Sequence, residues 1–238
     1  MKNKLENAMV RIKRLNAYSE CCNLIGRFHV YVGQGKMTEL IGLWANRDDC
    51  IYATPWGCYE GIRGIERCFM VDYGDFRDPR AAEGYKGYFN YQGTNGDYIE
   101  VAADLQTARG TWQCEGCVTF GKEVLDNYYK NRGFWNYSRY GVDFVFEDGK
   151  WKIWHMRFVP IIWSPYDVPW GDCEPYTRYP VRKTTEDCEP MAMPIFNYSY
   201  DCNFAASGNN IANPEAYNTW AEVAPGYGYE IEKAGVLK

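Results

Sequence analysis

Two basic side chains, two positions apart, lie in a segment of the chain that is otherwise typical of a buried strand. They are His155 and Arg157 of DGKWKIWHMRFVPIIW, residues 148–163, and His155 is one of two histidines in the 238 residues. Near neutral pH an imidazole can remove a proton next to a carbonyl or from a hydroxyl, and a guanidinium can stabilise the oxyanion that results. The pair therefore indicates acid–base chemistry without a cofactor, with both residues catalytic.

Strand geometry decides whether these two side chains can act together. Side chains alternate between the faces of a strand, so His155 and Arg157 are expected on the same face as Trp151 and Ile153. Asp143, in the preceding predicted strand, is a candidate to orient either of them. The alternative is structural: His155 donates a hydrogen bond to a neighbouring strand or carboxylate, and Arg157 pairs with an acid at the rim.

Two further candidates lie near the end of the first predicted helix. His29 and Tyr31 are two positions apart, which places them on different faces of a helix, so at most one is expected to face the interior. Tyr31 is the catalytic candidate, because it lies nearly one turn from the expected core residue Phe28. His29 is a candidate for substrate contact.

The cysteine and charge patterns argue against metal sites and polyanionic partners. Cys114 and Cys117 form an isolated CxxC, whereas a structural zinc site needs two more ligands. The formal net charge of −5 gives no basic footprint for nucleic acid or an anionic membrane. Phosphate-binding glycine loops, GxSxG and HExxH motifs are absent from the sequence. We expect no metal, no cofactor, no nucleic acid and no membrane partner.

The ends and the cysteines of the chain indicate a compartment. No run approaches the roughly 20 apolar residues of a membrane span, and the first residues, MKNKLENAMVRIKRLNAYSE, lack the apolar core of a signal peptide. The ten cysteines are then expected to be reduced thiols. These features favour a cytoplasmic protein.

Helices are predicted first and strands afterwards. Apolar residues recur at helical steps from Leu5 to Val32, on one expected face, and shorter helices are predicted at 36–45 and 61–73, on either side of a strand and turn at 50–61. Strands rich in β-branched and aromatic residues follow, at 86–92, 97–105, 107–120, 135–147 and 150–160. This order predicts an α+β domain, with the helices packed on one face of a curved, mainly antiparallel sheet.

The last third of the chain has a different composition. Residues from 160 onward hold nine of the eleven prolines but remain rich in Trp and Tyr, which is unlike a disordered linker. We expect a domain at 1–160 and an extended, ordered arm at 161–238, packed on the domain or on a partner subunit. Trp163, Tyr166 and Trp170 are expected to be buried.

Several phrases resemble the SnoaL-like branch of the nuclear transport factor 2 superfamily. They are GRFHVYVGQGKMTELIGLWANRDD, the turn GCYEGIRGIERCF, and the hairpins IEVAADLQTARGTW and RYGVDFVFEDGKWKIWHMRF, together spanning about residues 10 to 160. The resemblance implies a cone, in which a curved sheet wraps around helices and leaves an apolar cavity. It also implies a homodimer or higher homo-oligomer through the outer sheet face, where Trp154 and Phe158 are expected.

For the site, the resemblance implies that the face carrying Trp151 and Ile153 points into the cone, together with His155 and Arg157. Tyr91 lies in the strand where dehydratase relatives often carry a catalytic histidine, and its phenol is a candidate to donate a hydrogen bond to the substrate in the interior. Trp112 is expected as apolar cavity wall, and Asp143 as a substrate contact or as the group that orients the histidine.

The first helix departs from the dehydratase pattern. Such relatives carry Tyr and, five residues later, Asp, where this chain has Phe28 and Gly33. The expected activity is therefore a cofactor-independent lyase or isomerase that acts on an apolar, aromatic or polycyclic small molecule. The alternatives are a small-molecule binding protein and a dimeric interaction module, because the fold alone does not determine function.

Overall fold

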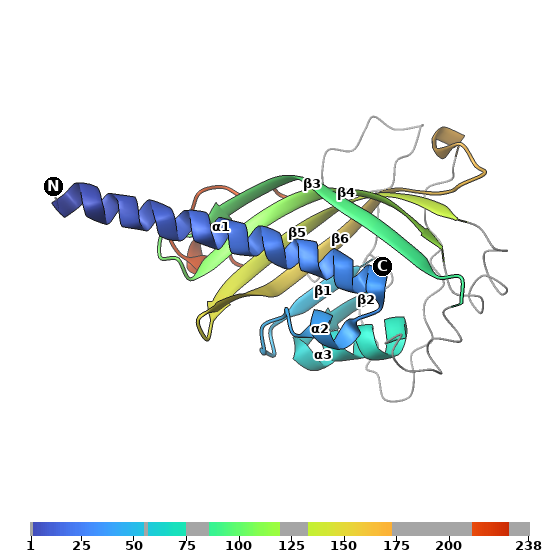
Figure 1. Cartoon of the computed structure of the whole chain (residues 1–238), viewed down its shortest axis with the longest axis horizontal. Helices are drawn as coiled ribbons and strands as arrows, with labels where there is room; N and C mark the ends of the chain where they lie inside the picture. The colour runs from blue at the N-terminus through green and yellow to red at the C-terminus, as the bar shows by residue number, and fades with distance from the viewer. Residues whose placement is uncertain (1, 55–56, 75–85, 120–132, 173–210, 229–238) are drawn as a thin grey trace, which may run out of the picture.

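The first helix is the longest element of the structure. The computed structural model describes residues 2–54, 57–74, 86–119, 133–172 and 211–228. Helix α1 (Lys2–Gln34) has 33 residues, and in Figure 1 its N-terminal end extends beyond the strands. Gly35, with φ of 65°, ends it in the left-handed conformation that glycine adopts without strain. Within the described residues, no helix combines the length and apolar character needed to cross a bilayer.

Short elements lead from α1 to the main sheet. They are α2 (Met37–Ile41), β1 (Ile51–Thr54), β2 (Gly57–Glu60), α3 (Gly61–Arg67) and the π-helical turn η1 (Cys68–Gly74). The helix predicted at 61–73 is confirmed, although its second half is a π-helix rather than an α-helix. The predicted strand and turn at 50–61 form the antiparallel pair β1 and β2.

Four long strands complete a six-stranded sheet of order β2-β1-β6-β5-β4-β3. They are β3 (Phe89–Val101), β4 (Thr107–Thr119), β5 (Phe134–Glu147) and β6 (Lys150–Pro165). All neighbours are antiparallel except β1 and β6, which are parallel. The predicted α+β class and mainly antiparallel sheet are confirmed. The two strands predicted at 86–92 and 97–105 are one strand, β3, with an irregularity between Asn95 and Tyr98.

A β-bulge in β6 reverses the alternation of side chains that the sequence pattern predicts. Asp143 pairs with His155, but the next residue of β5, Phe144, pairs with Ile153, so Trp154 is an extra residue. Ile153 therefore shares the main core with Phe144, whereas His155 lies on the opposite face beside Asp143. The prediction that Ile153 and His155 share a face is wrong, because strict alternation ends at the inserted residue.

Helix α1 uses different faces along its length. Ile25 and Phe28 are buried in the core, whereas Leu5 and Ile12 are exposed. A helix turns by about 100° per residue, so the 20 residues from Leu5 to Ile25 rotate the side-chain direction by about 200°. The prediction of a single apolar face from Leu5 to Val32 is therefore wrong, because steps of three and four residues drift around a straight helix.

The core between α1 and the sheet is largely aromatic. Phe28 is 2% exposed, and its ring lies edge-on to those of Tyr52, Phe69 and Tyr140 at centroid distances of 6.2, 6.0 and 6.3 Å. These partners come from β1, η1 and β5. One helical side chain thus joins three parts of the fold.

Residues 211–228, here called the C-terminal strap, cover part of the outer face of the sheet, which is the face away from α1. Tyr227 and Ile211 form a small apolar cluster with Val159 of β6. The backbone N–H groups of Ala103 and Asp104 donate to carbonyl groups of strap residues 217 and 218. In Figure 1 the strap, coloured orange to red, lies beside the sheet near the ends of β3 and β4.

Two aromatic residues that were expected on an outer dimer face are buried. Trp154 lies against Trp220 of the strap, with ring centroids 4.6 Å apart. Phe158 lies in the core against Tyr140, at a centroid distance of 5.0 Å. The homodimer stays a prediction, but neither side chain can supply its surface in this structure.

The described part of the tail is only partly buried. Trp163 is buried as expected, but Tyr166 and Trp170 are exposed, contrary to the prediction. Strand β6 continues to Pro165, past the expected boundary at 160. The rest of the predicted arm, at 173–210 and 229–238, lies outside the described residues.

We predict that Phe28→Ala lowers the free energy of unfolding by about 3–5 kcal/mol, because it removes a buried ring that three aromatic partners surround. Urea denaturation measures the change. Leu15→Ala is the matched control on the same helix, because Leu15 is exposed, and its effect should stay within about 0.5 kcal/mol. Equal effects of the two substitutions would show that Phe28 does not hold the core together.

Candidate functional site

A row of charged side chains crosses the outer face of three neighbouring strands. Arg109 of β4 is paired in register with Asp143 of β5, and Asp143 with His155 of β6. Arg109 Nε donates to Asp143 Oδ1 over 2.7 Å, and His155 Nδ1 lies 3.0 Å from Asp143 Oδ2. The predicted position of Asp143 beside the histidine is confirmed. Both Asp143 and His155 are almost completely buried.

The hydrogen bonds of His155 occupy both of its ring nitrogens. Nε2 lies 3.1 Å from the backbone carbonyl oxygen of Asp49, which can only accept, so Nε2 carries a hydrogen. Nδ1 faces the carboxylate of Asp143. Both ring nitrogens are thus engaged, and neither supplies the free lone pair that proton abstraction from a substrate requires.

The C-terminal strap closes over this row. The backbone N–H of Tyr227 donates to Asp143 Oδ2 over 2.7 Å. Gly226 lies so close that a Cβ atom there would clash with the ring of His155. Arg109 donates to the carbonyl oxygens of Val223 and Pro225 over 3.2 and 3.3 Å. The row is therefore held between the sheet and the strap rather than in the cone.

The electrostatic balance of the row favours the charged forms of Asp143 and Arg109. Burial alone would raise the pKa of Asp143, but the hydrogen bond from His155 and the charge of Arg109 outweigh it and hold that pKa below the ordinary value of 3.8. Burial likewise acts to lower the pKa of Arg109, and the adjacent carboxylate of Asp143 outweighs this effect, so the pKa is raised. The carboxylate of Asp143 is thus ionised, and it lies between two basic side chains. A buried charge is stable only when it is paired in this way.

Arg157 lies on the same outer face, opposite Gly141 in β5, and is 6% exposed. Its predicted neighbour relation to His155 along the strand is confirmed, but the predicted position of both residues inside the cone is wrong. The bulge at Trp154 moves them to the outer face, while Met156 and Phe158 point into the core.

A second set of polar side chains lies on the inner face of the sheet. Tyr140 Oη donates to Gln92 Oε1 over 3.1 Å, and Cys114 Sγ lies 3.4 Å from the same oxygen. Burial raises the pKa of the Cys114 thiol to about 12, so it stays protonated at neutral pH. His29 of α1 lies edge-on to Tyr140 at a ring-centroid distance of 5.1 Å. The helix and three strands thus bring hydroxyl, amide, thiol and imidazole groups to one interior.

Several atoms of this interior have no hydrogen-bond partner among the described residues. They include His29 Nε2, Trp44 Nε1 and both amide atoms of Asn136. Asn136 is 0% exposed, and it is paired across the sheet with Gly116, which is itself paired with Gln92. Leaving a buried polar group unpaired costs about 1–3 kcal/mol. Such groups are kept where a ligand or ordered water can satisfy them.

His29 is neutral at pH 7, as a general base must be before it accepts a proton. Its Nε2 atom is enclosed, and burial lowers its pKa to about 4. The imidazole is therefore neutral at pH 7 and keeps a lone pair. His29 was expected as a substrate contact, and the structure gives it the environment that was predicted for His155.

The remaining candidates divide between the two faces. Trp112 is buried in the core against Phe144, at a ring-centroid distance of 5.9 Å, as expected for an apolar wall. Tyr31 is partly buried against the same core. Tyr91 is 66% exposed and lies on the outer face, so its predicted contact with the interior is wrong. The inner position of β3 is taken by the next residue, Gln92.

Sequence reasoning missed Gln92, Asn136, Tyr140 and Arg109. The parity of β3 could have identified Gln92, because it depends only on which of two neighbours faces in. Asn136 is buried between the exposed aromatic residues Trp135 and Tyr137, which reverses the usual pattern, so its inward position had no signal in the sequence; Tyr140 lies four positions on, on the same face of β5. Arg109 likewise had no signal, because its burial depends on the strap.

The described residues contain no cluster of three or more His, Cys, Asp or Glu side chains arranged for a metal ion. Cys114 and Cys117 of the CxxC are three positions apart on β4, which places them on opposite faces of the strand. They cannot act as a pair of ligands there.

The inner and outer faces belong to a domain that is similar to known proteins. A family model described as a SnoaL-like domain matches residues 13–157, so the strap lies outside the match. Among solved structures, LinA aligns with a TM-score of 0.51 at 14% identity, covering 66% of this chain and 95% of LinA. Hexachlorocyclohexane dehydrochlorinase LinA-type3 from Novosphingobium barchaimii LL02 gives 0.51 at 15% identity, covering 67% and 99%. At these identities the similarity establishes the fold. The search of curated proteins found no match.

We predict that Asp143→Asn lowers the free energy of unfolding by about 3–5 kcal/mol at pH 7, because Arg109 loses its buried counter-charge and His155 its carboxylate partner. The folded-state pKa of Asp143 lies below 3.8, so its contribution is present above that pH and is lost as the pH falls through the lowered value. Thermal unfolding between pH 3 and 7 measures both effects.

Asp148→Asn is the control for this change, because Asp148 is exposed at the turn between β5 and β6, and asparagine tolerates its positive φ of 51°. Its effect should be near zero. An acid-unfolding profile of Asp143→Asn identical to that of the unsubstituted protein would contradict the linkage of Asp143 to stability.

Proposed function

Since the chain belongs to the SnoaL-like domain family of the nuclear transport factor 2 superfamily, we propose that its interior holds a cofactor-independent lyase or isomerase site with His29 as the general base. The observation that carries this proposal is the set of buried, unpaired polar atoms on the inner face, His29 Nε2 and the Asn136 amide. Both belong to elements that line one interior, and both lack the partners that a purely structural role would provide.

The proposed chemistry follows from the state of each group. Neutral His29 takes a proton from a carbon next to a carbonyl, and the electron pair of the broken C–H bond forms a double bond. In a lyase, a leaving group on the next carbon departs with its own bonding pair. In an isomerase, the proton returns at another carbon. Tyr140, whose hydroxyl lies within reach of Gln92, is the proposed donor to the carbonyl oxygen, where negative charge develops.

The ligand is proposed to be an apolar, ring-containing small molecule with at least one carbonyl or hydroxyl group. Trp112, Phe28 and Phe144 give the interior its apolar character, while Asn136 offers one donor and one acceptor. The similarity to a dehydrochlorinase establishes the fold alone. Elimination chemistry in this chain is therefore proposed from its own residues. In this proposal the row formed by Arg109, Asp143 and His155 stabilises the fold and does not touch the substrate.

We predict that His29→Gln lowers turnover by about 10² to 10⁴, because the amide keeps a similar volume but cannot accept a proton. A panel of bicyclic β-hydroxy ketones serves as the probe, and the conjugated enone formed by loss of water is followed by absorbance. Activity should fall below about pH 4, where His29 becomes protonated.

His155→Gln is the matched control for that experiment. It should lower the melting temperature, because Asp143 loses one of its partners, and should leave turnover per folded molecule nearly unchanged. Loss of turnover in His155→Gln at unchanged stability, with full activity in His29→Gln, would return the role of base to His155. Binding of the panel without turnover by the unsubstituted protein would indicate a carrier.

We also predict that Asn136→Leu stabilises the protein by about 1–3 kcal/mol, because an unpaired buried amide is replaced by an apolar group of similar size. The same change should weaken ligand binding, measured as a smaller ligand-induced rise in melting temperature. Val142→Ala, at a fully buried apolar position of the same strand, is the control and should destabilise. Destabilisation by Asn136→Leu would show that the amide serves the fold rather than a ligand.

A further inference from the structure

The N-terminal half of α1, residues 2–16, carries an apolar stripe that the described structure leaves uncovered. Leu5, Met9 and Ile12 are 66%, 48% and 49% exposed. Their spacing of four and three residues places them within about 60° of one another around the helix. The first turns of α1 extend beyond the sheet (Figure 1).

The stripe faces away from the sheet. Arg14 Nη2 donates to the carbonyl oxygen of Val101 over 2.7 Å, and the hydroxyl of Tyr18 donates to Asp97, so these residues mark the side of α1 that faces β3. Nine residues separate Leu5 from Arg14, which is a rotation of about 180°. Folding of this chain therefore cannot turn the stripe inward while those contacts are kept.

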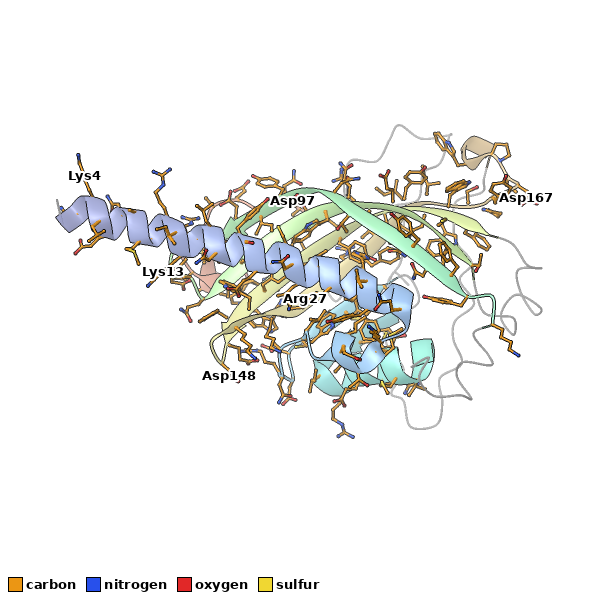
Figure 2. The ribbon with its side chains drawn as sticks, viewed as in Figure 1. Lys4, Lys13, Arg27, Asp97, Asp148 and Asp167 are labelled. Atoms are coloured by element: carbon orange, nitrogen blue, oxygen red, sulfur yellow. The ribbon has the colours of Figure 1, made fainter. Side chains whose placement is uncertain are left out.

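Basic side chains lie along both edges of the stripe. At about 100° per residue, Lys4 and Arg11 flank it on one side and Lys13 on the other. Lys4 and Lys13 point to opposite sides of the projecting helix (Figure 2). Residues 2–14 hold five basic side chains and one acidic, Glu6, in a chain with net charge −5. The projecting helix is thus positively charged on an acidic protein.

A second copy of the helix is a poor occupant for this stripe. Residues 2–16 span about two heptads, fewer than the three or four over which a coiled-coil pattern must be sustained. Two such helices placed stripe to stripe in antiparallel order would also bring Lys4 and Arg11 of both copies together. Like charges along a shared seam oppose association.

We propose that residues 2–16 form an interfacial anchor that binds an anionic lipid surface. The helix lies in the plane of the membrane surface, with Leu5, Met9 and Ile12 at the boundary between headgroups and acyl chains. Lys4, Arg11 and Lys13 then extend along the edges to the lipid phosphates. This proposal replaces the expectation, based on the net charge of the whole chain, that membranes are not a partner. It is independent of the site in the interior.

The test compares binding of the whole protein to two kinds of vesicle, phosphatidylcholine alone and phosphatidylcholine with phosphatidylglycerol, by cosedimentation. We expect binding to the anionic vesicles that weakens as salt is raised, and little binding to the neutral ones. Ile12→Glu should weaken binding on the order of tenfold or more, because it removes apolar area and adds a negative charge.

Val10→Glu is the matched control. Val10 is 48% exposed on the same helix but lies about 140° around the axis from Leu5, outside the stripe. It introduces the same charge and should retain clearly more binding than Ile12→Glu. Circular dichroism and melting temperature confirm that both variants are folded.

Three results would overturn the proposal. One is equal binding to neutral and anionic vesicles, or to neither. Another is an equal loss in the two variants. The third is a dimer in light scattering that Ile12→Glu converts to a monomer, with no vesicle binding by the unsubstituted protein, which would assign the stripe to a second copy.

Discussion

The carboxylate of Asp143 is the point at which the sheet and the C-terminal strap are joined. It accepts hydrogen bonds from Arg109 of β4 and from the backbone of Tyr227 in the strap, and it pairs with His155 of β6. A buried carboxylate is stable only when such partners are present. Asp143 finds all of these partners only when the three strands are in register and the strap is in place. The register of the strands and the position of the strap therefore depend on each other.

The two faces of the sheet differ in how their polar groups are paired. On the outer face Arg109, Asp143 and His155 are hydrogen-bonded in a row that the strap covers. On the inner face several polar atoms, including those of His29 and Asn136, lack partners among the described residues. A fully paired network fixes structure, whereas unpaired groups in an apolar surrounding are a cost that a ligand can remove. The proposed site therefore lies where the protein has left interactions unmade.

Much of the architecture could be predicted from the sequence, because the order of elements, the burial of Trp112 and the proximity of Asp143 to His155 depend on local patterns. The face of His155 could not. It depends on the bulge at Trp154, whose indole is covered by Trp220, a residue far away in the sequence and outside any strand pattern. The burial of Arg109 was missed for the same reason, because the strap residues that cover it are far away in the sequence. The exposure of Tyr91 shows that alternation alone leaves the inner face of a strand undetermined.

The strap also has a consequence for how the protein is made. A ribosome synthesises residues 13–157, the family domain, before it reaches Gly226 and Tyr227. Until those residues emerge, the nascent domain presents Trp154 and the row of Arg109, Asp143 and His155 to its surroundings. Domains begin to fold during synthesis, and incomplete ones expose surface that chaperones and proteases recognise. Closure of the strap thus depends on residues that are synthesised after the family domain, and a chain that stops before Gly226 lacks that cover.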